Sequence, residues 1–280
     1  METKKTWLIT GTSQGIGLEI VKMALANGDN VVATARKVQS LKKVVGISSA
    51  NFLPIEVDLL DEASIQAAVM FAEETFGSID VLVNNAGYGL MAGIEEASKE
   101  EVQASFDINV FAALGMVRAV LPGMRKAGKG HIINISSVFG LIAGKGWGIY
   151  CATKFAMEGF SEALAEELTP FKLKVTIVEP GYFRTNFLKN GSVALPSKEL
   201  TEYTEISEIK RMHSQEIVGN QPGDPEKAAQ VIYKISEMEN PPLRILLGSD
   251  AIKYAGYKIE QLKTQMAAHL QLSVSTDFNQ

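Results

Sequence analysis

Short apolar runs rich in β-branched residues alternate with longer amphipathic runs along most of the chain. The first pair is Trp7-Leu8-Ile9, which predicts a strand, and the segment 15–27, whose apolar residues recur at helical spacing. Repeated strand–helix–strand units predict a parallel sheet, and right-handed crossovers then give a doubly wound α/β fold. We expect a mainly parallel seven-stranded sheet with helices on both faces. The expected strands are 7–9, 31–33, 52–57, 79–83, 132–135, 175–178 and 243–247, and the expected helices are 15–27, 38–45, 61–76, 99–126, 149–169, one starting at 225, and 250–270.

Prolines and one irregular segment add detail to this pattern. Pro54 lies inside a predicted strand and therefore indicates an edge position, since proline cannot donate to a ladder. Pro122-Gly123 predicts a kink in the helix 99–126. Residues 181–223 are polar and show no clear strand, which is typical of a functional loop, so we expect a substrate lid at about 186–222. The whole chain, 1–280, is predicted to be a single domain that ends in a helical extension at about 249–280.

The charge balance and the few cysteine and histidine residues exclude several classes of protein. The net charge of −5 argues against a nucleic-acid partner, because phosphate binding needs a basic face. Cys151 is the only cysteine and the three histidines lie far apart, so we expect no disulfide and no metal site. No apolar leader precedes the first strand, and polar residues interrupt the longest uncharged stretch, His131–Gly144. We therefore expect a cytoplasmic protein without a membrane span.

A glycine-rich turn directly follows the first predicted strand and reads Thr10-Gly11-Thr12-Ser13-Gln14-Gly15-Ile16-Gly17. Between a strand and a helix, such a turn can present backbone N–H groups to a phosphate, and the helix N-terminus adds partial positive charge. The spacing is G-x-x-x-G-x-G and differs from the usual dinucleotide motif. The turn therefore predicts a phosphate site, with an ordinary tight turn as the alternative.

The end of the second predicted strand indicates which dinucleotide would bind. An acidic residue there would bind both ribose hydroxyls of NAD, but the chain has the cations Arg36 and Lys37 instead. Adjacent cations suit the 2′-phosphate of NADP, so we favour NADP(H) over NAD(H). The alternative is a solvated basic turn. Asp58, at the end of the third strand, is expected beside the adenine or, equally, as a residue that caps the next element.

Tyr150 and Lys154 are four residues apart on a predicted helix and so share one face. A free tyrosine has a pKa of about 10, and a neighbouring ammonium would lower it. Ser137 ends the fifth strand, where side chains face the ligand crevice of such sheets. The three residues predict proton transfer at a carbonyl or alcohol oxygen, coupled to hydride transfer. Alone, the Tyr-x-x-x-Lys pair would more often be a surface pair.

Taken together, the motifs resemble those of the short-chain dehydrogenase/reductase family, in its order and spacing, from residue 6 to about 185. The resemblance implies a Rossmann-like fold and, from the Ala35-Arg36 pair, similarity to NADP-preferring members. The matching motifs are Thr10 to Gly17, Asn84-Asn85-Ala86-Gly87, Asn109, Ser137, Tyr150 with Lys154, and Pro180-Gly181 followed by Thr185.

The resemblance implies a role for each matching residue. Tyr150 would be the general acid/base, and Lys154 would hold the nicotinamide ribose and lower the pKa of Tyr150. Ser137 would orient the substrate oxygen, and Asn109 would hold a proton-relay water. The predicted cofactor-binding residues are Gly11, Ser13, Gln14, Gly15, Ile16, Gly17, Arg36, Lys37, Asp58, Leu59, Asn85, Ala86, Gly87, Tyr150, Lys154, Pro180, Gly181, Phe183 and Thr185.

The sequence therefore predicts an NADP(H)-dependent oxidoreductase that interconverts a ketone or aldehyde and an alcohol, with Tyr150 as general acid/base. The alternatives are an NAD(H)-dependent alcohol dehydrogenase and a non-catalytic dinucleotide-binding sensor. The resemblance also implies a homo-oligomer that packs through the helices near 99–125 and 149–169. Apolar residues in the variable loops predict a small-molecule substrate that is an apolar ketone, aldehyde or alcohol with some bulk. The expected pocket walls are Tyr88, Leu90, Phe139, Leu141, Trp147, Tyr182 and Phe187.

Overall fold

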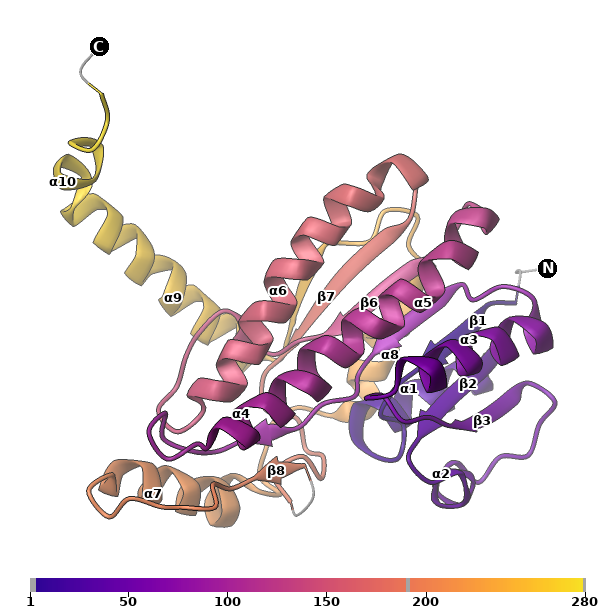
Figure 1. Cartoon of the computed structure of the whole chain (residues 1–280), viewed down its shortest axis with the longest axis horizontal. Coiled ribbons are helices and arrows are strands. Elements are labelled where there is room, and N and C mark those ends of the chain that lie inside the picture. Colours follow the sequence, from indigo (N-terminus) through magenta and orange to yellow (C-terminus); the bar gives the residue numbers. More distant parts are fainter. Residues whose placement is uncertain (1–3, 190–191, 279–280) are drawn as a thin grey trace.

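The computed structural model describes residues 4–189 and 192–278 and centres on one seven-stranded sheet. The strand order is β3-β2-β1-β4-β6-β7-β9, and every pairing is parallel (Figure 1). The chain starts in the middle of the sheet, moves outward to β3 and then returns to build the other half, which confirms the predicted doubly wound fold. The strands are β1 (Thr6–Ile9), β2 (Asn30–Ala35), β3 (Phe52–Glu56), β4 (Val81–Asn84), β6 (His131–Ile135), β7 (Lys174–Pro180) and β9 (Arg244–Leu247).

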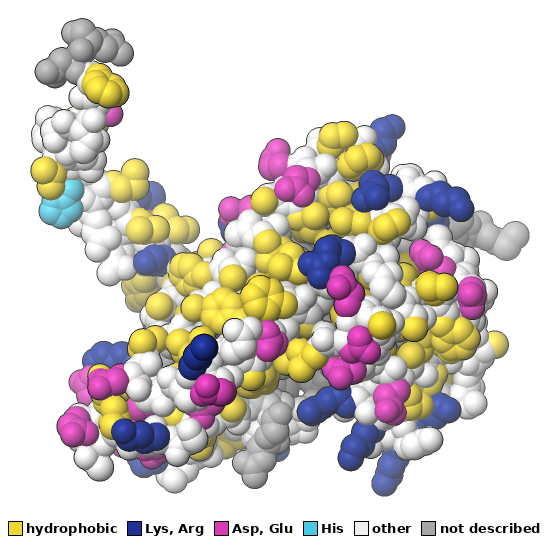
Figure 2. All heavy atoms as spheres, in the orientation of Figure 1, with side chains coloured by type: hydrophobic (Ala, Val, Ile, Leu, Met, Phe, Trp, Pro, Cys, Tyr) yellow, Lys and Arg dark blue, Asp and Glu magenta, His cyan; other side chains and the backbone are white. Residues whose placement is uncertain are grey.

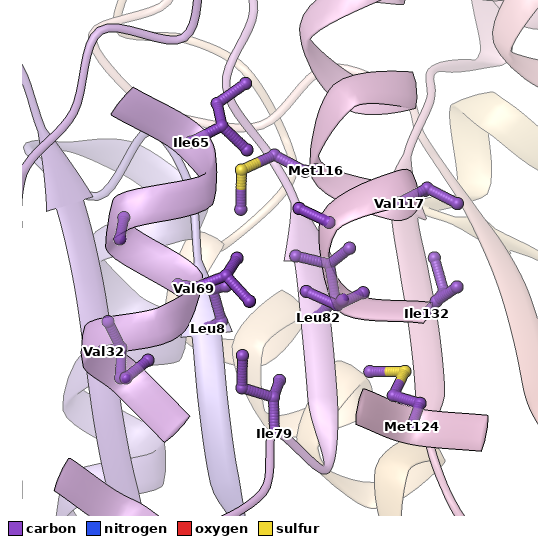
Figure 3. Packing of buried hydrophobic residues seen from close by; sticks show 14 of the residues in the cluster. Leu8, Val32, Ile65, Val69, Ile79, Leu82, Met116, Val117, Met124 and Ile132 are labelled. Carbon is purple, nitrogen blue, oxygen red and sulfur yellow. The ribbon is translucent and has the colours of Figure 1, made fainter. Parts of the chain in front are cut away.

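Helices cover both faces of the sheet because successive strand residues point to opposite sides. Leu8 joins one buried cluster, with α3, α5 and α6, whereas its neighbours Trp7 and Ile9 join the other, with α1, α2 and α8. Figure 3 shows the first cluster, in which Ile65 and Met116 lie over the sheet. Burying each large aliphatic side chain contributes about 1.5–3 kcal/mol, so these clusters hold the layers together. The helices are α1 (Gly15–Ala26), α2 (Val38–Val45), α3 (Glu62–Phe76), α4 (Lys99–Phe106), α5 (Ala112–Ala127), α6 (Gly148–Leu168) and α8 (Pro225–Glu237).

The two expectations drawn from prolines have different outcomes. β3, which contains Pro54, is an edge strand, as predicted. The helix predicted at 99–126 is interrupted, but not at Pro122, because α5 continues through that residue. The departure from α-helical geometry is a π-helical turn, Asp107–Phe111, between α4 and α5. Such turns are frequent at functional sites, and this one carries Asn109.

The segment 181–223 contains more regular structure than expected. It includes β8 (Val193–Ala194), which pairs in parallel with β5 (Gly89–Leu90), and α7 (Thr204–Met212), followed by a π-helical turn, His213–Ile217. The expectation of no strand was wrong because two residues carry no periodicity and their partner lies far away in the sequence. Residues 190 and 191 of the expected lid lie outside the described residues.

The C-terminal helices α9 (Ser249–Ala268) and α10 (Leu270–Val274) extend away from the body of the protein (Figure 1). Only the first turns of α9 have buried residues, Ala251 and Ala255. Beyond them, α9 exposes large apolar side chains, among them Tyr257 and Met266. Figure 2 shows hydrophobic side chains along this extension. A helical extension is therefore present where the sequence predicts it.

One stretch among the described residues, Lys99–Ala127, is long and apolar enough to cross a membrane by length and composition alone. It comprises α4, the π-helical turn and α5, and 56% of its most apolar window is buried inside the protein. A core helix of a soluble protein passes the same test, and α5 packs on the sheet in the way such a helix does. The stretch is therefore weak evidence for a membrane span.

Candidate active site

A cavity of about 1120 Å³ lies where the parallel strands end. Its walls come from residues just after β1, β2, β3, β4, β6 and β7, which is the position of ligand crevices in doubly wound sheets. The 186–222 segment and the start of α9 form its outer wall. The fold therefore brings together chemical groups that are more than a hundred residues apart.

The glycine-rich turn packs closely against the loop after β4. A Cβ on Gly17 would lie 2.3 Å from Asn85 Nδ2, and one on Gly11, whose φ is +67°, would lie 2.7 Å from Ala86 Cα. Asn85 Nδ2 donates to the carbonyl oxygens of Thr10, at 3.0 Å, and Gly11, at 2.9 Å. The glycines are thus required for close approach, and the turn has the shape of a cradle for a flat or anionic group.

Nearly all predicted site residues line this one cavity. Gly17 is the exception within the turn, since it packs against Asn85 behind it. Of the two adjacent cations, Arg36 lines the cavity, whereas Lys37 is exposed outside it. Asp58 also lines the cavity, and its Oδ1 accepts from the Leu60 N–H at 2.9 Å, while Asp61 is the N-cap of α3. Asp58 therefore forms a turn as well as facing the cavity.

Ser137, Tyr150 and Lys154 meet at the junction of β6 and α6. Tyr150 lies in the first turn of α6 and Lys154 in the next, both buried. The Lys154 ammonium donates to the Ile135 carbonyl at 2.8 Å, which places it beside the end of β6. Burial raises the pKa of the Tyr150 phenol, and a hydrogen bond with Ser137 acts in the opposite direction. Ser137 and Tyr150 can therefore act on one oxygen atom in the cavity, with the Lys154 ammonium buried nearby.

The expected lowering of the Tyr150 pKa by Lys154 is not found. The Lys154 Nζ lies 5.8 Å from the centroid of the Tyr150 ring, and burial of the phenol dominates its pKa. Burial instead lowers the pKa of Lys154 itself to about 8, and Glu158 acts against that change. The prediction overlooked desolvation, which penalises both charged forms when the pair is buried.

Asn109 lies behind the cavity wall and does not line it. Its side-chain oxygen accepts from the Tyr88 N–H at 2.9 Å, and its nitrogen donates to the Tyr88 carbonyl at 2.9 Å and to Thr153 Oγ1 at 3.1 Å. The amide thus fixes the loop after β4 that carries Gly87 and Tyr88. The role of Asn109 as the holder of a relay water stays a prediction.

The substrate side of the cavity was predicted only in part. Five expected wall residues line it, but Leu90 is buried in β5 and Leu141 lies outside the cavity. The predicted lid includes α7 and the turn after it, but the sequence did not show which of their residues line the cavity, nor that α9 contributes, because nothing local in the sequence tells how these segments pack. The confirmed wall residues are Tyr88, Phe139, Trp147, Tyr182 and Phe187, and those missed include Ile209, Met212, His213 and Tyr254.

His213 and Tyr182 form a polar pair on this otherwise apolar side. His213 Nδ1 lies 2.8 Å from the Ile209 carbonyl, which can only accept, so Nδ1 carries the hydrogen. Nε2 then accepts from the Tyr182 hydroxyl at 2.8 Å. Burial lowers the pKa of His213, which keeps the ring neutral, and its edge packs on Trp147 with ring centroids 5.2 Å apart. The pair is thus a fixed hydrogen-bonding group in the substrate wall.

Comparison with known proteins identifies the family. A family profile described as short chain dehydrogenase matches residues 5–194. The chain belongs to the short-chain dehydrogenase/reductase family. It is therefore an oxidoreductase of this family, with the family's Rossmann-like fold.

Individual relatives extend this similarity over most of the chain. A short-chain dehydrogenase of Streptomyces avermitilis has a crystal structure that matches with a TM-score of 0.91 and 37% identity, covering 99% of this chain and 100% of the other. A 3-ketodihydrosphingosine reductase of Bacteroides thetaiotaomicron is 38% identical over 86% of this chain and 87% of its own length. A closed form of serine dehydrogenase complexed with NADP+ matches with a TM-score of 0.74 and 28% identity, covering 86% and 94% of the two chains.

Within the described part of the chain, no group of three or more histidine, cysteine, aspartate or glutamate residues could hold a metal ion.

Proposed function

We propose that the protein is an NADP(H)-dependent oxidoreductase that interconverts a ketone or aldehyde and an alcohol by hydride transfer. One observation supports this above all others. Ser137, Tyr150 and Lys154 line the same cavity as the glycine-rich turn and Arg36. A proton donor is thus combined with a dinucleotide cradle in one continuous space of about 1120 Å³.

The residues of the cradle fit a dinucleotide that carries an additional phosphate. Residues Gly11 to Ile16 of the turn line the cavity, and their backbone N–H groups would bind a pyrophosphate there. Arg36 lines the same space and is exposed, so its planar guanidinium is available for a 2′-phosphate. When bound, the nicotinamide cofactor supplies or accepts the hydride.

The protein side chains would supply the proton and the polar contacts. In the direction of reduction, Tyr150 donates its phenolic proton to the carbonyl oxygen of the substrate as the alcohol forms. Burial keeps this phenol protonated at neutral pH, which suits it to act as the acid. Ser137 donates a hydrogen bond that orients the reacting oxygen. Lys154, as an ammonium, stabilises the phenolate that remains after the proton has moved.

The substrate side supports an apolar carbonyl compound with one additional polar group. Its wall is mostly aromatic and aliphatic, with Phe139, Trp147 and Phe187 around Tyr150. The pair of His213 and Tyr182 is a fixed polar point in that wall. The relative from Bacteroides thetaiotaomicron is named as a reductase of a 3-keto compound, which is consistent with this reaction class.

We also propose that the enzyme is a homo-oligomer in the cytoplasm. Large apolar side chains exposed near α5 and α6, Phe111 and Phe155, support packing through these helices. Figure 2 shows hydrophobic side chains gathered on this face.

Tyr150→Phe tests the proposed reaction. It removes the phenolic proton but keeps the ring, so turnover of a carbonyl panel with NADPH should fall by about 10²- to 10⁴-fold. Binding of NADPH, measured by calorimetric titration, should remain close to that of the wild type. Tyr257→Phe, on the exposed part of α9, is the matched control and should leave turnover unchanged. Unchanged turnover in Tyr150→Phe would contradict the proposal.

A further inference from the structure

A buried acidic cluster lies behind the proposed catalytic residues. Glu158, on α6, and Glu179, on β7, are 5% and 0% exposed, and both bind Arg244 at the start of β9. Arg244 Nη2 donates to Glu158 at 2.8 Å, and Arg244 Nε donates to Glu179 at 2.5 Å. The same guanidinium also donates to Glu162, which is half exposed, at 2.7 Å. One cation thus faces three carboxyl groups, two of them buried.

The cluster meets the catalytic residues at the end of β6. The Ile135 carbonyl accepts from Lys154, and the next residue, Ser136, lies beside Glu158. A Cβ on Gly140 would lie 2.6 Å from Ser136 Oγ and 2.7 Å from Glu158 Oε1, so these two polar atoms converge on one point. Neither atom has a hydrogen-bond partner among the described residues. Glu158 also follows Lys154 by one turn of α6, on the same face.

Arg244 holds Glu158 in a buried ion pair. Burial and the facing Glu158 raise the pKa of the Glu179 carboxyl, and Arg244 acts against that change. The pair of Glu158 and Arg244 thus places an acidic side chain one turn of α6 beyond Lys154. The pair is required because an uncompensated charge of either sign would be costly to bury here.

We propose that Glu158, held by Arg244, is a positioning residue that keeps the Lys154 ammonium charged next to Tyr150. This inference rests on the proposed function, which assigns the chemistry to Tyr150 and Lys154. Nothing in that function requires an acidic residue one turn further along α6, yet the structure buries one there and pairs it.

Electrostatics supply the reason. Burial lowers the pKa of Lys154 to about 8, so the ammonium form persists only up to slightly above neutral pH. Glu158 opposes this lowering of the pKa. Tyr150 faces Lys154 from the preceding turn but is neutral while protonated. Asn109 and Lys154 both lie next to Gly87, and the Asn109 side chain carries no charge. Arg244, Glu162 and Glu179 lie beyond Glu158 and act on Lys154 mainly by fixing that carboxylate.

A direct titration of Lys154 tests the inference without any substrate. The full-length protein is labelled with lysine carrying ¹³C at Cε, and the Lys154 signal is assigned by its loss in Lys154→Met. In Glu158→Gln the midpoint of this signal should fall by on the order of one pH unit, because an anion has been removed. Glu162→Gln removes a carboxylate from the same Arg244 and is the matched control, with an expected midpoint close to that of the wild type. A wild-type midpoint in folded Glu158→Gln would overturn the inference.

The conservative replacement separates charge from packing. Glu158→Asp keeps the negative charge on a shorter side chain, so the Lys154 midpoint should return toward the wild-type value. An equal fall in Glu158→Asp and Glu158→Gln would overturn the inference, since charge would then not be the cause. If Glu158→Gln does not fold, the double variant Glu158→Gln/Arg244→Met removes both charges and avoids an unpaired buried cation. Its Lys154 midpoint should fall by less than in Glu158→Gln, because a positive charge is removed as well, and a midpoint above that of the wild type would overturn the inference.

Kinetics distinguish failure of this inference from failure of the proposed function. The pH at which kcat for carbonyl reduction declines on the alkaline side should move down in Glu158→Gln by the same amount as the NMR midpoint. If no carbonyl is reduced by the wild type, the proposed function fails, but a shifted Lys154 midpoint still supports the charge relation. If carbonyls are reduced and neither midpoint nor pH profile shifts, the function stands and the inference fails.

Discussion

The two sides of the cavity are held in place by different kinds of contact. The side with the glycine-rich turn is fixed by the sheet and by hydrogen bonds to backbone atoms, such as those from Asn85 to the carbonyls of Thr10 and Gly11. The side formed by the 186–222 segment is joined to the body by the two-residue pairing of β8 with β5 and by side-chain contacts with distant parts of the chain. Glu96, before α4, is the centre of these contacts.

Glu96 accepts three hydrogen bonds, two of which join the 186–222 segment to the body. Its carboxylate accepts from the Gly93 N–H at 2.8 Å, the Leu200 N–H at 3.0 Å and the Lys210 ammonium at 3.2 Å. Burial alone would raise the pKa of Glu96, but these donors together hold it below its usual value. The buried Glu96 carboxylate thus helps to hold the 186–222 side of the cavity in place, as backbone hydrogen bonds hold the side with the glycine-rich turn.

The comparison teaches which changes each side tolerates. Backbone contacts on the side with the glycine-rich turn leave no room for an added atom. Changes there should therefore weaken cofactor binding, and the effect should be the same for every substrate. Side-chain contacts on the other side can be exchanged without altering the sheet, so changes there should affect the substrate alone. The predictions below test this division.

Gly17→Ala should have the largest effect, on cofactor binding. Its Cβ would lie 2.3 Å from Asn85 Nδ2 and 2.6 Å from the Gly11 carbonyl, so Asn85 must move and lose its contacts. The strain and lost hydrogen bonds amount to about 2–4 kcal/mol, or roughly 30- to 1,000-fold weaker binding of NADPH. Calorimetric titration measures this directly.

Gly159→Ala is the matched control for this variant. Gly159 lies on α6 and has no atom within 4 Å of an added Cβ, so NADPH binding should be unchanged. Equal affinities in the two variants would show that the close approach of the turn to Asn85 is not needed for binding.

Arg36→Ser should weaken binding of NADPH but not of NADH. A charge-assisted hydrogen bond to a 2′-phosphate is worth about 1.5–3 kcal/mol, or roughly 10- to 100-fold. Lys37→Ser, whose side chain lies outside the cavity, should change either affinity much less. If Arg36→Ser lowers both affinities equally, Arg36 is not reading the phosphate, and NAD(H) becomes the expected cofactor.

The same division explains how much of the molecule the sequence predicts. Local patterns in the sequence predict the strands, the glycine-rich turn and the order of Ser137, Tyr150 and Lys154. These motifs lie on strands and helices whose hydrophobic periodicity is visible in the sequence. The sheet then brings them together because parallel strands all end at one edge. Nearly every residue predicted to bind the cofactor therefore lines one cavity.

What the sequence did not predict depends on distant contacts. His213 and Tyr254 line the cavity only because the turn after α7 and the first turns of α9 lie against it. The pairing of β8 with β5 depends on residues about a hundred positions apart. The pKa of Tyr150 was misjudged for a similar reason, because burial by the completed fold outweighs the adjacent cation. Local sequence patterns do not show how deeply the folded protein buries a side chain such as Tyr150.

Lys210→Met should affect the substrate and spare the cofactor. It leaves the Glu96 carboxylate, which is fully buried, without its ammonium partner and so loosens α7 from the body. We expect kcat/KM for an accepted carbonyl to fall on the order of 10-fold, because the outer wall closes less often. The Kd for NADPH should remain that of the wild type.

Arg211→Met is the control for the loss of a cation from α7. Arg211 is exposed and pairs with Glu208 and Glu216 on the same segment, so its removal should leave kcat/KM nearly unchanged. A fall in NADPH affinity in Lys210→Met alone would mean that the two sides of the cavity are coupled.

Tyr182→Phe should have the smallest effect, confined to substrates with a second polar group. It removes the hydroxyl that donates to His213 Nε2, at 2.8 Å, but keeps the aromatic wall. One neutral hydrogen bond is worth about 1 kcal/mol, so KM for a hydroxylated ketone should rise by roughly 5-fold, while KM for its purely apolar analogue stays constant. Tyr254→Phe is the control variant. Tyr254, on α9, lines the same cavity, but the hydroxyl bonded to His213 is that of Tyr182. Equal increases for both ketones in Tyr182→Phe would mean that the pair maintains the shape of the wall and does not recognise the substrate.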